Sequence, residues 1–188
     1  MIKQTSARNI LSAKRNLAIG AIISGSLVTL PVMAVQLGNG QIAFNYPPRL
    51  VKATTSYRSP HTPATYYFTL AIPQNAGEPL GAVTISQRQN SDTVSFDPSR
   101  SRAFLGSRFA RGSEIPLASI GGEQPNKPGE ATIAFDPPVS PGTTVTVALR
   151  AKRNPSGGIY LFGVTAFPTG EKSSGQFLGY GRLHFGSR

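Results

Sequence analysis

Short segments with an apolar residue at every second position recur through the sequence, and prolines and glycines separate them. In TTVTVALR, residues 143–150, the valines and the leucine share one face, and most of the threonines and the first alanine share the other. A period of two residues is typical of a β-strand with one buried face. Other such segments are QIAFNY (41–46), LVKATTSY (50–57), TYYFTLAI (65–72), AVTISQR (82–88), TVSFD (93–97), ATIAFD (131–136), GIYLFGVTAF (158–167) and QFLGYGRLHF (176–185).

The connections between these segments carry residues that favour turns, such as Asp136-Pro137-Pro138 and Ser140-Pro141-Gly142. No stretch has the pattern of a convincing amphipathic helix. The best candidate, residues 99–110, contains Gly106 and is expected to form one helical turn or a long loop. Many short strands at this spacing predict an all-β fold, an antiparallel β-sandwich with a broadly immunoglobulin-like architecture.

The first 34 residues have the three parts of a secretory signal peptide: a basic head without acidic residues, an apolar run and small residues near Ala34. A retained membrane anchor is the alternative, but it needs about 20 apolar residues, and this run is interrupted by Gly20, Gly25 and Pro31. We therefore expect cleavage after Ala34 and one domain over residues 35–188, without a transmembrane segment. The destination would be the periplasm, the thylakoid lumen or the cell exterior.

The charge of the expected mature chain favours anionic partners. The sequence has 19 Lys and Arg against 8 Asp and Glu, and loss of the four basic residues of the head leaves a net charge of +7. Such a surface attracts acidic polysaccharide, lipid head groups or an acidic protein. Export and the modest charge density argue against nucleic acid. The sequence has no cysteine, which excludes disulfides, thiol catalysis and cysteine-ligated metals.

The residues that bind metals are few and scattered, so the sequence predicts no metal and no cofactor. His61 and His184 are the only histidines, whereas a zinc or copper site needs three or four ligands. Asp92 and Asp97 lack the spacing of a calcium loop.

Known catalytic motifs are also missing, and we assign no catalytic residue. The sequence has neither a GxSxG nucleophile elbow nor a supported Ser-x-x-Lys motif. A glycosidase needs two carboxylates, and Glu78 and Glu171, both in Gly-Glu turns, are the pair we would name, with His184 beside them. The sequence thus favours a protein that is not an enzyme, with a hydrolase of envelope glycans or esters as the alternative.

A basic segment with interleaved phenylalanines is the best candidate for a binding surface. Arginine and aromatic side chains together bind sulfate, carboxylate or sugar. The alternative is a solvated loop whose phenylalanines fill the core. The arginines that we assign to an anionic partner, an envelope polymer or a protein, are Arg100, Arg102, Arg108 and Arg111.

The C-terminal segment, residues 157–185, is rich in glycine and aromatic residues, and we interpret it as two paired strands rather than a reactive site. PTGEKSSG, residues 168–175, would connect them. The strand 176–185 would place alternate residues on one face, namely Phe177, Gly179, Gly181, Leu183 and Phe185. Glycines inside strands mark bulges or close approaches of another backbone.

Several motifs resemble a secreted cyanobacterial family that is catalogued as domain of unknown function 2808. They are PPRL (47–50), TYYFTL (65–70), AGEPL (76–80), FDPPVSPGTTVTVAL (135–149), RNPSGGIYLFGVTAFPTGE (153–171) and GQFLGYGRLHF (175–185). The resemblance implies export in a cyanobacterium and implies no activity. With the charge and the missing motifs, it leads us to expect a non-catalytic exported binding or structural module of the cell envelope.

Overall fold

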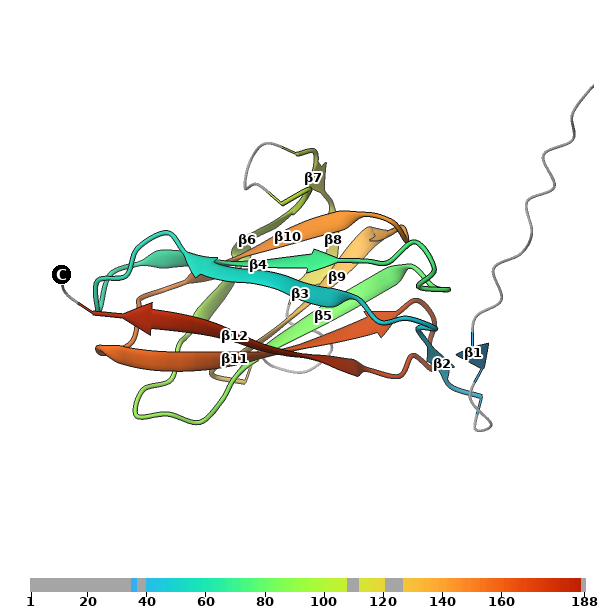
Figure 1. Cartoon of the computed structure of the whole chain (residues 1–188). Helices are drawn as coiled ribbons and strands as arrows, with labels where there is room; N and C mark the ends of the chain where they lie inside the picture. The colour runs from blue at the N-terminus through green and yellow to red at the C-terminus, as the bar shows by residue number, and fades with distance from the viewer. Residues whose placement is uncertain (1–34, 37–39, 108–111, 121–126, 187–188) are drawn as a thin grey trace, which may run out of the picture. The chain divides into compact units, whose positions relative to one another are not determined.

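Most of the alternating segments form strands, and these form two antiparallel sheets (Figure 1). Of the segments 41–46 and 93–97, only residues 42–43 and 96–97 lie in strands. The computed structural model describes residues 35–36, 40–107, 112–120 and 127–186, and it has no helix in these ranges. The predicted signal peptide, residues 1–34, lies outside them, so its cleavage and the boundary of the domain stay predictions. Alternate residues of β4, Ala64–Ala71, and β10, Thr144–Ala151, are buried between the sheets, as the period of two predicts.

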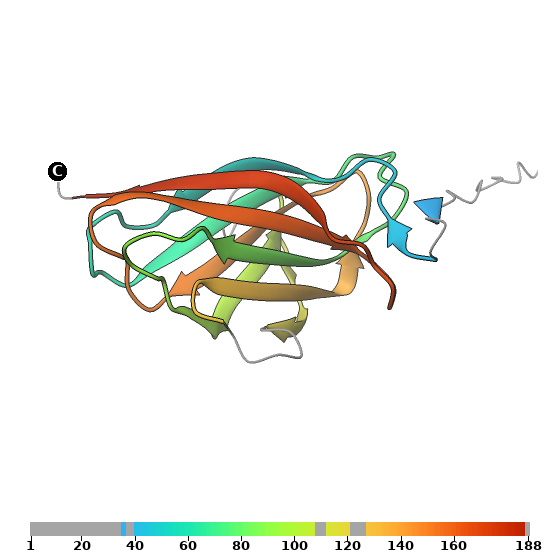
Figure 2. The ribbon, with the colours of Figure 1, turned by 90° about the horizontal axis from the view of Figure 1, so that it is seen from below.

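Each sheet has five strands, and every pair is antiparallel. The first, sheet I, has the order β3 (Arg49–Thr55), β4, β10, β6 (Phe96–Leu105) and β7 (Glu114–Ile115). The second, sheet II, has the order β12 (Gln176–Phe185), β11 (Gly158–Pro168), β5 (Leu80–Gln87), β9 (Glu130–Val139) and β8 (Leu117–Ile120). Figure 2 shows β12, β11, β5 and β9 side by side. A separate pair, β1 (Val35–Gln36) and β2 (Ile42–Ala43), precedes both sheets.

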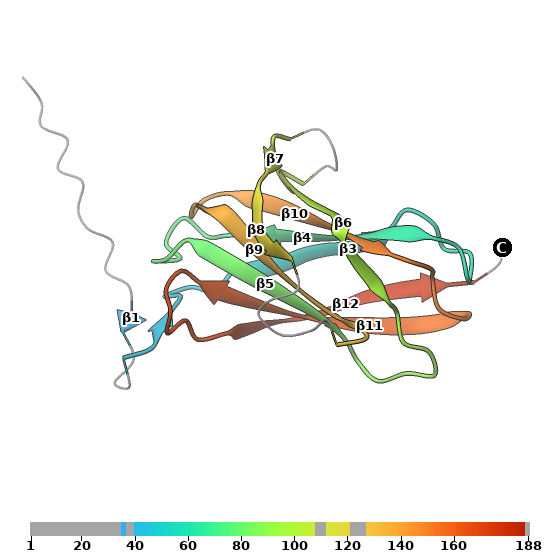
Figure 3. The same ribbon diagram turned by 180° about the vertical axis from the view of Figure 1, so that it is seen from behind.

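The order of the strands confirms the predicted immunoglobulin-like sandwich. Seven strands taken in chain order, β3, β4, β5, β6, β10, β11 and β12, divide between the sheets as strands A to G of an immunoglobulin constant domain do. The order β3-β4-β10-β6 corresponds to A-B-E-D, and β12-β11-β5 corresponds to G-F-C. The insertion between β6 and β10 adds β9 to sheet II, and β7 and β8 pass from one sheet to the other through Pro116 (Figure 3).

Aromatic side chains from both sheets fill the core. Tyr66 contacts Phe162 and Phe185 with ring centroids 5.5 Å apart in each pair, and Phe68 lies 6.0 Å from Phe162. All four side chains are fully buried. Burial of one such side chain stabilises the fold by about 1.5–3 kcal/mol relative to its exposure, so these rings are a main reason why the two sheets stay together.

The segment 99–110 does not form the helical turn or loop that we expected in its first part, because β6 continues through it to Leu105. After the buried Phe96 at its start, the inward positions of this strand are Ser101 and Ala103, which are small and give a weak hydrophobic pattern. The strand is also interrupted by a bulge at residues 98–101. There the buried Ser101 hydroxyl donates to the Asp97 carbonyl and accepts from the Arg150 N–H, so a side chain completes the ladder.

The strand at 176–185 has the predicted facing from Gly179 onward and the opposite facing in the residues before it. Gly181, Leu183 and Phe185 are buried as expected, but Phe177 points outward and is 57% exposed. The cause is a bulge: Val164 of β11 pairs with Gly179 and Thr165 pairs with Phe177, so Leu178 is an extra residue in β12. One inserted residue reverses the facing of everything that precedes it.

The edge strands β3 and β12 belong to different sheets and pack against each other, which closes one side of the sandwich. Gly181 makes this approach possible. A Cβ atom built on it would lie 2.6 Å from the Ala53 Cβ and 3.0 Å from the Phe68 ring. Neither neighbour can move away without a shift of the backbone or of the core.

We predict that Gly181→Ala lowers the free energy of unfolding by about 1–3 kcal/mol, since the added methyl group forces the two edges apart. Urea unfolding followed by circular dichroism measures this. Gly157→Ala is the matched control, because a Cβ atom there would have its nearest neighbour 3.8 Å away. Equal stability of the two variants would contradict the tight approach at Gly181.

Candidate functional site

Basic side chains gather at one end of the sandwich. There the β3–β4, β5–β6 and β10–β11 loops meet the C-terminal end of β12, whose arrowhead lies beside the β3–β4 loop (Figure 1). We call this region the cationic end. Its loops hold one carboxylate, that of Asp92. Its basic side chains, all exposed, are Arg58, His61, Arg88, Lys152, Arg153, Arg182 and His184.

The buried side chain of Asn154 fixes the loop that carries Arg58. Its Nδ2 donates to the carbonyls of Tyr57 and Ser59, at 3.0 and 2.9 Å, and its Oδ1 accepts from the Tyr66 hydroxyl at 3.0 Å. Burial, and to a lesser degree the nearby Tyr160, raises the pKa of Tyr66, so its hydroxyl stays protonated and remains a donor. Every polar atom of the Asn154 side chain is therefore engaged, and the loop is held to the core.

Asp92 is committed to the neighbouring loop. Its Oδ2 accepts a hydrogen bond of 2.8 Å from the Ser156 N–H. Hydrogen bonding by Ser156, followed by the positive charges of His61 and Arg153, lowers the pKa of Asp92. These groups surround a small polar hollow of about 270 Å³. The carboxylate thus holds two loops together and neutralises only its immediate neighbours.

At the β3–β12 edge, by contrast, the basic side chains have no acidic partner among the described residues. Arg58, Arg182 and His184 surround two adjoining hollows of about 160 and 670 Å³, and we call these three side chains and the space between them the cationic hollow. No carboxylate of a described residue lies within salt-bridge distance of them. Asp97 on β6 and Glu130 on β9 are each three strands away from this edge. The cationic hollow therefore has an uncompensated positive potential.

The basic segment that we selected from the sequence lies elsewhere. Arg100 is exposed on the bulge of β6, and the exposed Arg102 has its Nε 3.1 Å from Glu114 Oε1. Arg102 also donates to the carbonyls of residues 99 and 101. Arg108 and Arg111 lie outside the described residues. The assignment of the four arginines to an anionic partner stays a prediction, and one of them is already paired with an acid.

The three residues that we would have named for a hydrolase are not brought together. His184 pairs with Ile159 at the beginning of β11, whereas Glu171 follows the end of that strand. Glu78 lies near the same end as Glu171, since its carboxylate accepts a hydrogen bond from Thr169. Ten residues of extended β11 separate the two ends, roughly 30 Å. Among the described residues, no three His, Asp or Glu side chains are placed to hold a metal ion.

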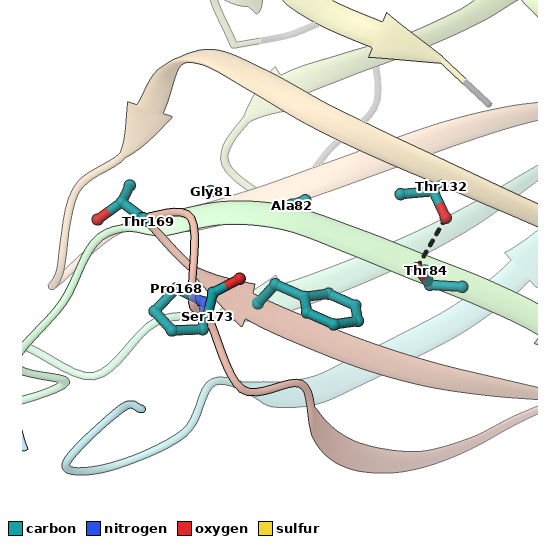
Figure 4. Close-up of a pocket in the computed structure, with 9 residues that line it drawn as sticks. Gly81, Ala82, Thr84, Thr132, Pro168, Thr169 and Ser173 are labelled. Carbon is teal, nitrogen blue, oxygen red and sulfur yellow. Dashed lines mark hydrogen bonds between the residues drawn. The ribbon is translucent and has the colours of Figure 1, made fainter. Parts of the chain in front are cut away.

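A third hollow lies on the outer face of sheet II (Figure 4). It has a volume of about 690 Å³ and is lined by small residues of β5, the end of β11 and the loop after it, with the Phe167 side chain at its side. The hydroxyls of Thr84 and Thr132 lie on it and form a hydrogen bond of 2.8 Å with each other. This hollow has no charged lining residue.

The fold defines an immunoglobulin-like β-sandwich protein, and a family model identifies its relatives. The model described as "Protein of unknown function (DUF2808)" matches residues 41–185, and the chain belongs to this family. No curated protein matches the sequence. The described part of the chain contains no helix with the length and hydropathy that a membrane span requires.

Three solved structures illustrate the likeness to known proteins. The collagen-binding subdomain ACE19 of the Enterococcus faecalis surface protein ACE has 9% identity and a TM-score of 0.42 over 74% of this chain and 98% of that chain. The pilus 2b backbone protein of group B streptococcus has 13% identity and a TM-score of 0.41 over 71% and 56%.

The third comes from a study of manganese lipoxygenase of Gaeumannomyces graminis and zonadhesin of Komagataella pastoris, with 11% identity and a TM-score of 0.38 over 71% and 48%. The chain thus spans about half the length of the last two proteins. The strand order itself defines the fold.

We predict that Tyr66→Phe destabilises the protein by about 1–3 kcal/mol, because it leaves the Asn154 Oδ1 buried without a donor. Thermal and urea unfolding measure the loss. Tyr160→Phe is the control: that ring is equally buried, but the nearest partner of its hydroxyl is Ser91 Oγ at 3.4 Å, a long hydrogen bond. The same loss in both variants would mean that the hydrogen bond from the Tyr66 hydroxyl to Asn154 has no special role in stability.

Proposed function

We propose that the protein is a non-catalytic binding module of the cell envelope, exported by its N-terminal segment, and that its ligand is an anionic polymer. The periplasm, the thylakoid lumen and the cell exterior are the compartments that suit this role. Membership of the DUF2808 family agrees with the proposal and assigns no chemistry. The separation of His184 from Glu78 and Glu171 removes the arrangement on which the hydrolase alternative depended.

The observation that carries the proposal is the cationic hollow. Arg58 and Arg182 present guanidinium groups, which bind carboxylate, sulfate or phosphate in a fork geometry. Neither arginine forms a salt bridge with an acidic side chain of the described residues, whereas Arg102 is paired with Glu114. An anion that enters the hollow would gain contacts without first breaking an ion pair.

The form of the cationic hollow favours a polymer over a small molecule. Sites for small ligands are enclosed and bury most of the ligand surface. Here the two adjoining spaces follow the edge of the sandwich and are lined by exposed side chains such as Tyr57, Arg58 and His184. A chain with repeated negative charges can contact several cations in succession, so weak contacts add up.

We predict that Arg58→Ser with Arg182→Ser weakens binding to immobilised polygalacturonate by about tenfold, since two charge-assisted contacts are lost. Affinity chromatography in a salt gradient measures the change, and wild-type retention must fall as ionic strength rises. The matched variant is Arg100→Ser with Arg102→Ser, which removes two exposed arginines from β6.

The second pair tests the surface that the sequence suggested. Weaker retention with Arg58→Ser and Arg182→Ser, together with unchanged retention with Arg100→Ser and Arg102→Ser, would support binding at the cationic hollow. A loss with this pair alone would place it on β6 and contradict our assignment. If neither pair changes retention, or wild-type protein is not retained, the proposed ligand class is wrong.

A further inference from the structure

Two aromatic side chains stand exposed and side by side on the outer face of sheet II. Phe177 is 57% exposed and Tyr180 is 49% exposed, and their ring centroids are 5.1 Å apart at an interplanar angle of 69°. Residues three apart in a regular strand point to opposite faces. The bulge at Leu178, with Gly179 in the left-handed region at φ 114°, turns Phe177 to the outer face, where regular alternation already places Tyr180. The two rings share one face only because of this irregularity.

The sheet beneath the pair is adapted to it. Gly163 of β11 lies under both rings, and a Cβ atom there would be 3.2 Å from the Phe177 ring and 3.5 Å from the Tyr180 ring. This glycine is covered, although it faces away from the core. Any larger residue would lift the rings from the sheet. We call Phe177, Tyr180 and the glycine beneath them the aromatic shelf.

Positive charges continue from the aromatic shelf along β12. The guanidinium carbon of Arg88 lies 5.8 Å from the centroid of the Tyr180 ring, a cation–π contact. Arg182 and His184 follow on the exposed side of the same strand, roughly 7 and 13 Å further along. Along the outer face of β12, the aromatic rings are therefore followed by Arg182 and His184 of the cationic hollow.

We propose that the aromatic shelf is a sugar-binding surface, and that the anionic polymer is an acidic polysaccharide that lies along β12. The proposal rests on the proposed function and specifies its ligand. One sugar ring would place its C–H groups on an aromatic face, which carries partial negative charge. Carboxylates of the following sugars would then reach Arg182, His184 and Arg58.

The surroundings of the aromatic shelf favour a glycan over a protein partner. Protein interfaces have an apolar centre from which charged residues are depleted. Here Arg88 contacts the Tyr180 ring, Arg182 follows Tyr180 by two residues on the same face of β12, and Ser86 lies next to Gly163 on the other neighbouring strand. Guanidinium and hydroxyl groups close to a ring can hydrogen-bond to sugar hydroxyls and carboxylates while the ring carries the stacking.

The test compares two soluble anionic polymers by titration calorimetry with purified protein. Polygalacturonate has a carboxylate on every sugar, and poly-L-glutamate has carboxylates without sugars. We expect Phe177→Ala with Tyr180→Ala to weaken polygalacturonate binding by about fivefold to tenfold and to change poly-L-glutamate binding by less than about twofold. Arg58→Ser with Arg182→Ser should weaken both.

Two controls separate the ring from other effects. Tyr180→Phe keeps the ring and should keep the affinity for polygalacturonate. Tyr46→Ala removes a side chain of similar exposure, 56%, from the N-terminal region outside the shelf and should change neither titration. Unfolding midpoints verify that every variant is folded.

The outcomes distinguish the two proposals. Equal effects of the double aromatic variant on both polymers, or no effect on either, overturn the sugar-binding shelf and leave the anionic ligand in place. If wild-type protein binds neither polymer, the proposed function fails. Titration with a soluble neutral glucan then tests the shelf alone. If the shelf binds sugar, the wild-type protein binds the glucan, and the variant without Phe177 and Tyr180 does not. If Phe177→Ala with Tyr180→Ala loses binding to anionic lipid vesicles but keeps its affinity for polygalacturonate, the rings belong to a membrane-binding surface and the inference is overturned.

Discussion

The packing of Tyr66 is the interaction on which the rest of the structure depends. Its ring lies in the centre of the aromatic core and contacts Phe162 and Phe185 of sheet II, so it joins the two layers. Its hydroxyl reaches the end of the sandwich and donates to Asn154, which holds the β3–β4 loop. One side chain thus connects the stability of the core with the placement of Arg58, because the loop cannot shift without the loss of a buried hydrogen bond.

The sequence predicted the fold well where hydrophobic alternation was strong and failed where small or inserted residues hid it. The segments around β4, β10 and β11 alternate clearly, and all three are strands. In β6 the inward residues after Phe96 are Ser101 and Ala103, so this part of the strand was taken for a loop or helical turn. In β12 one inserted residue reversed the facing of Phe177. Periodicity alone cannot reveal a bulge, since the extra residue is defined by its pairing with another strand.

The candidate site could not be predicted for a different reason. Arg100 and Arg102 drew attention because they are close in sequence, yet Arg102 is paired with Glu114. Arg58 and Arg182 are far apart in the sequence and become neighbours only because β3 and β12 are the edge strands that meet. In a sandwich, the first and last strands of the domain can thus bring together residues that are distant in the sequence. The spacing of residues along the sequence therefore could not show this cluster, which the topology brings together.

The bulge in β12 has a consequence beyond the direction of the Phe177 ring. A long, regular strand at the border of a sheet offers its free main-chain groups to any other chain in extended conformation. The extra residue at Leu178 breaks this regular spacing near the beginning of the border strand. The same irregularity that turns Phe177 outward thus interrupts the regular ladder through which copies of the protein could pair, so the exposed pair of rings and the break in the edge come from one inserted amino acid.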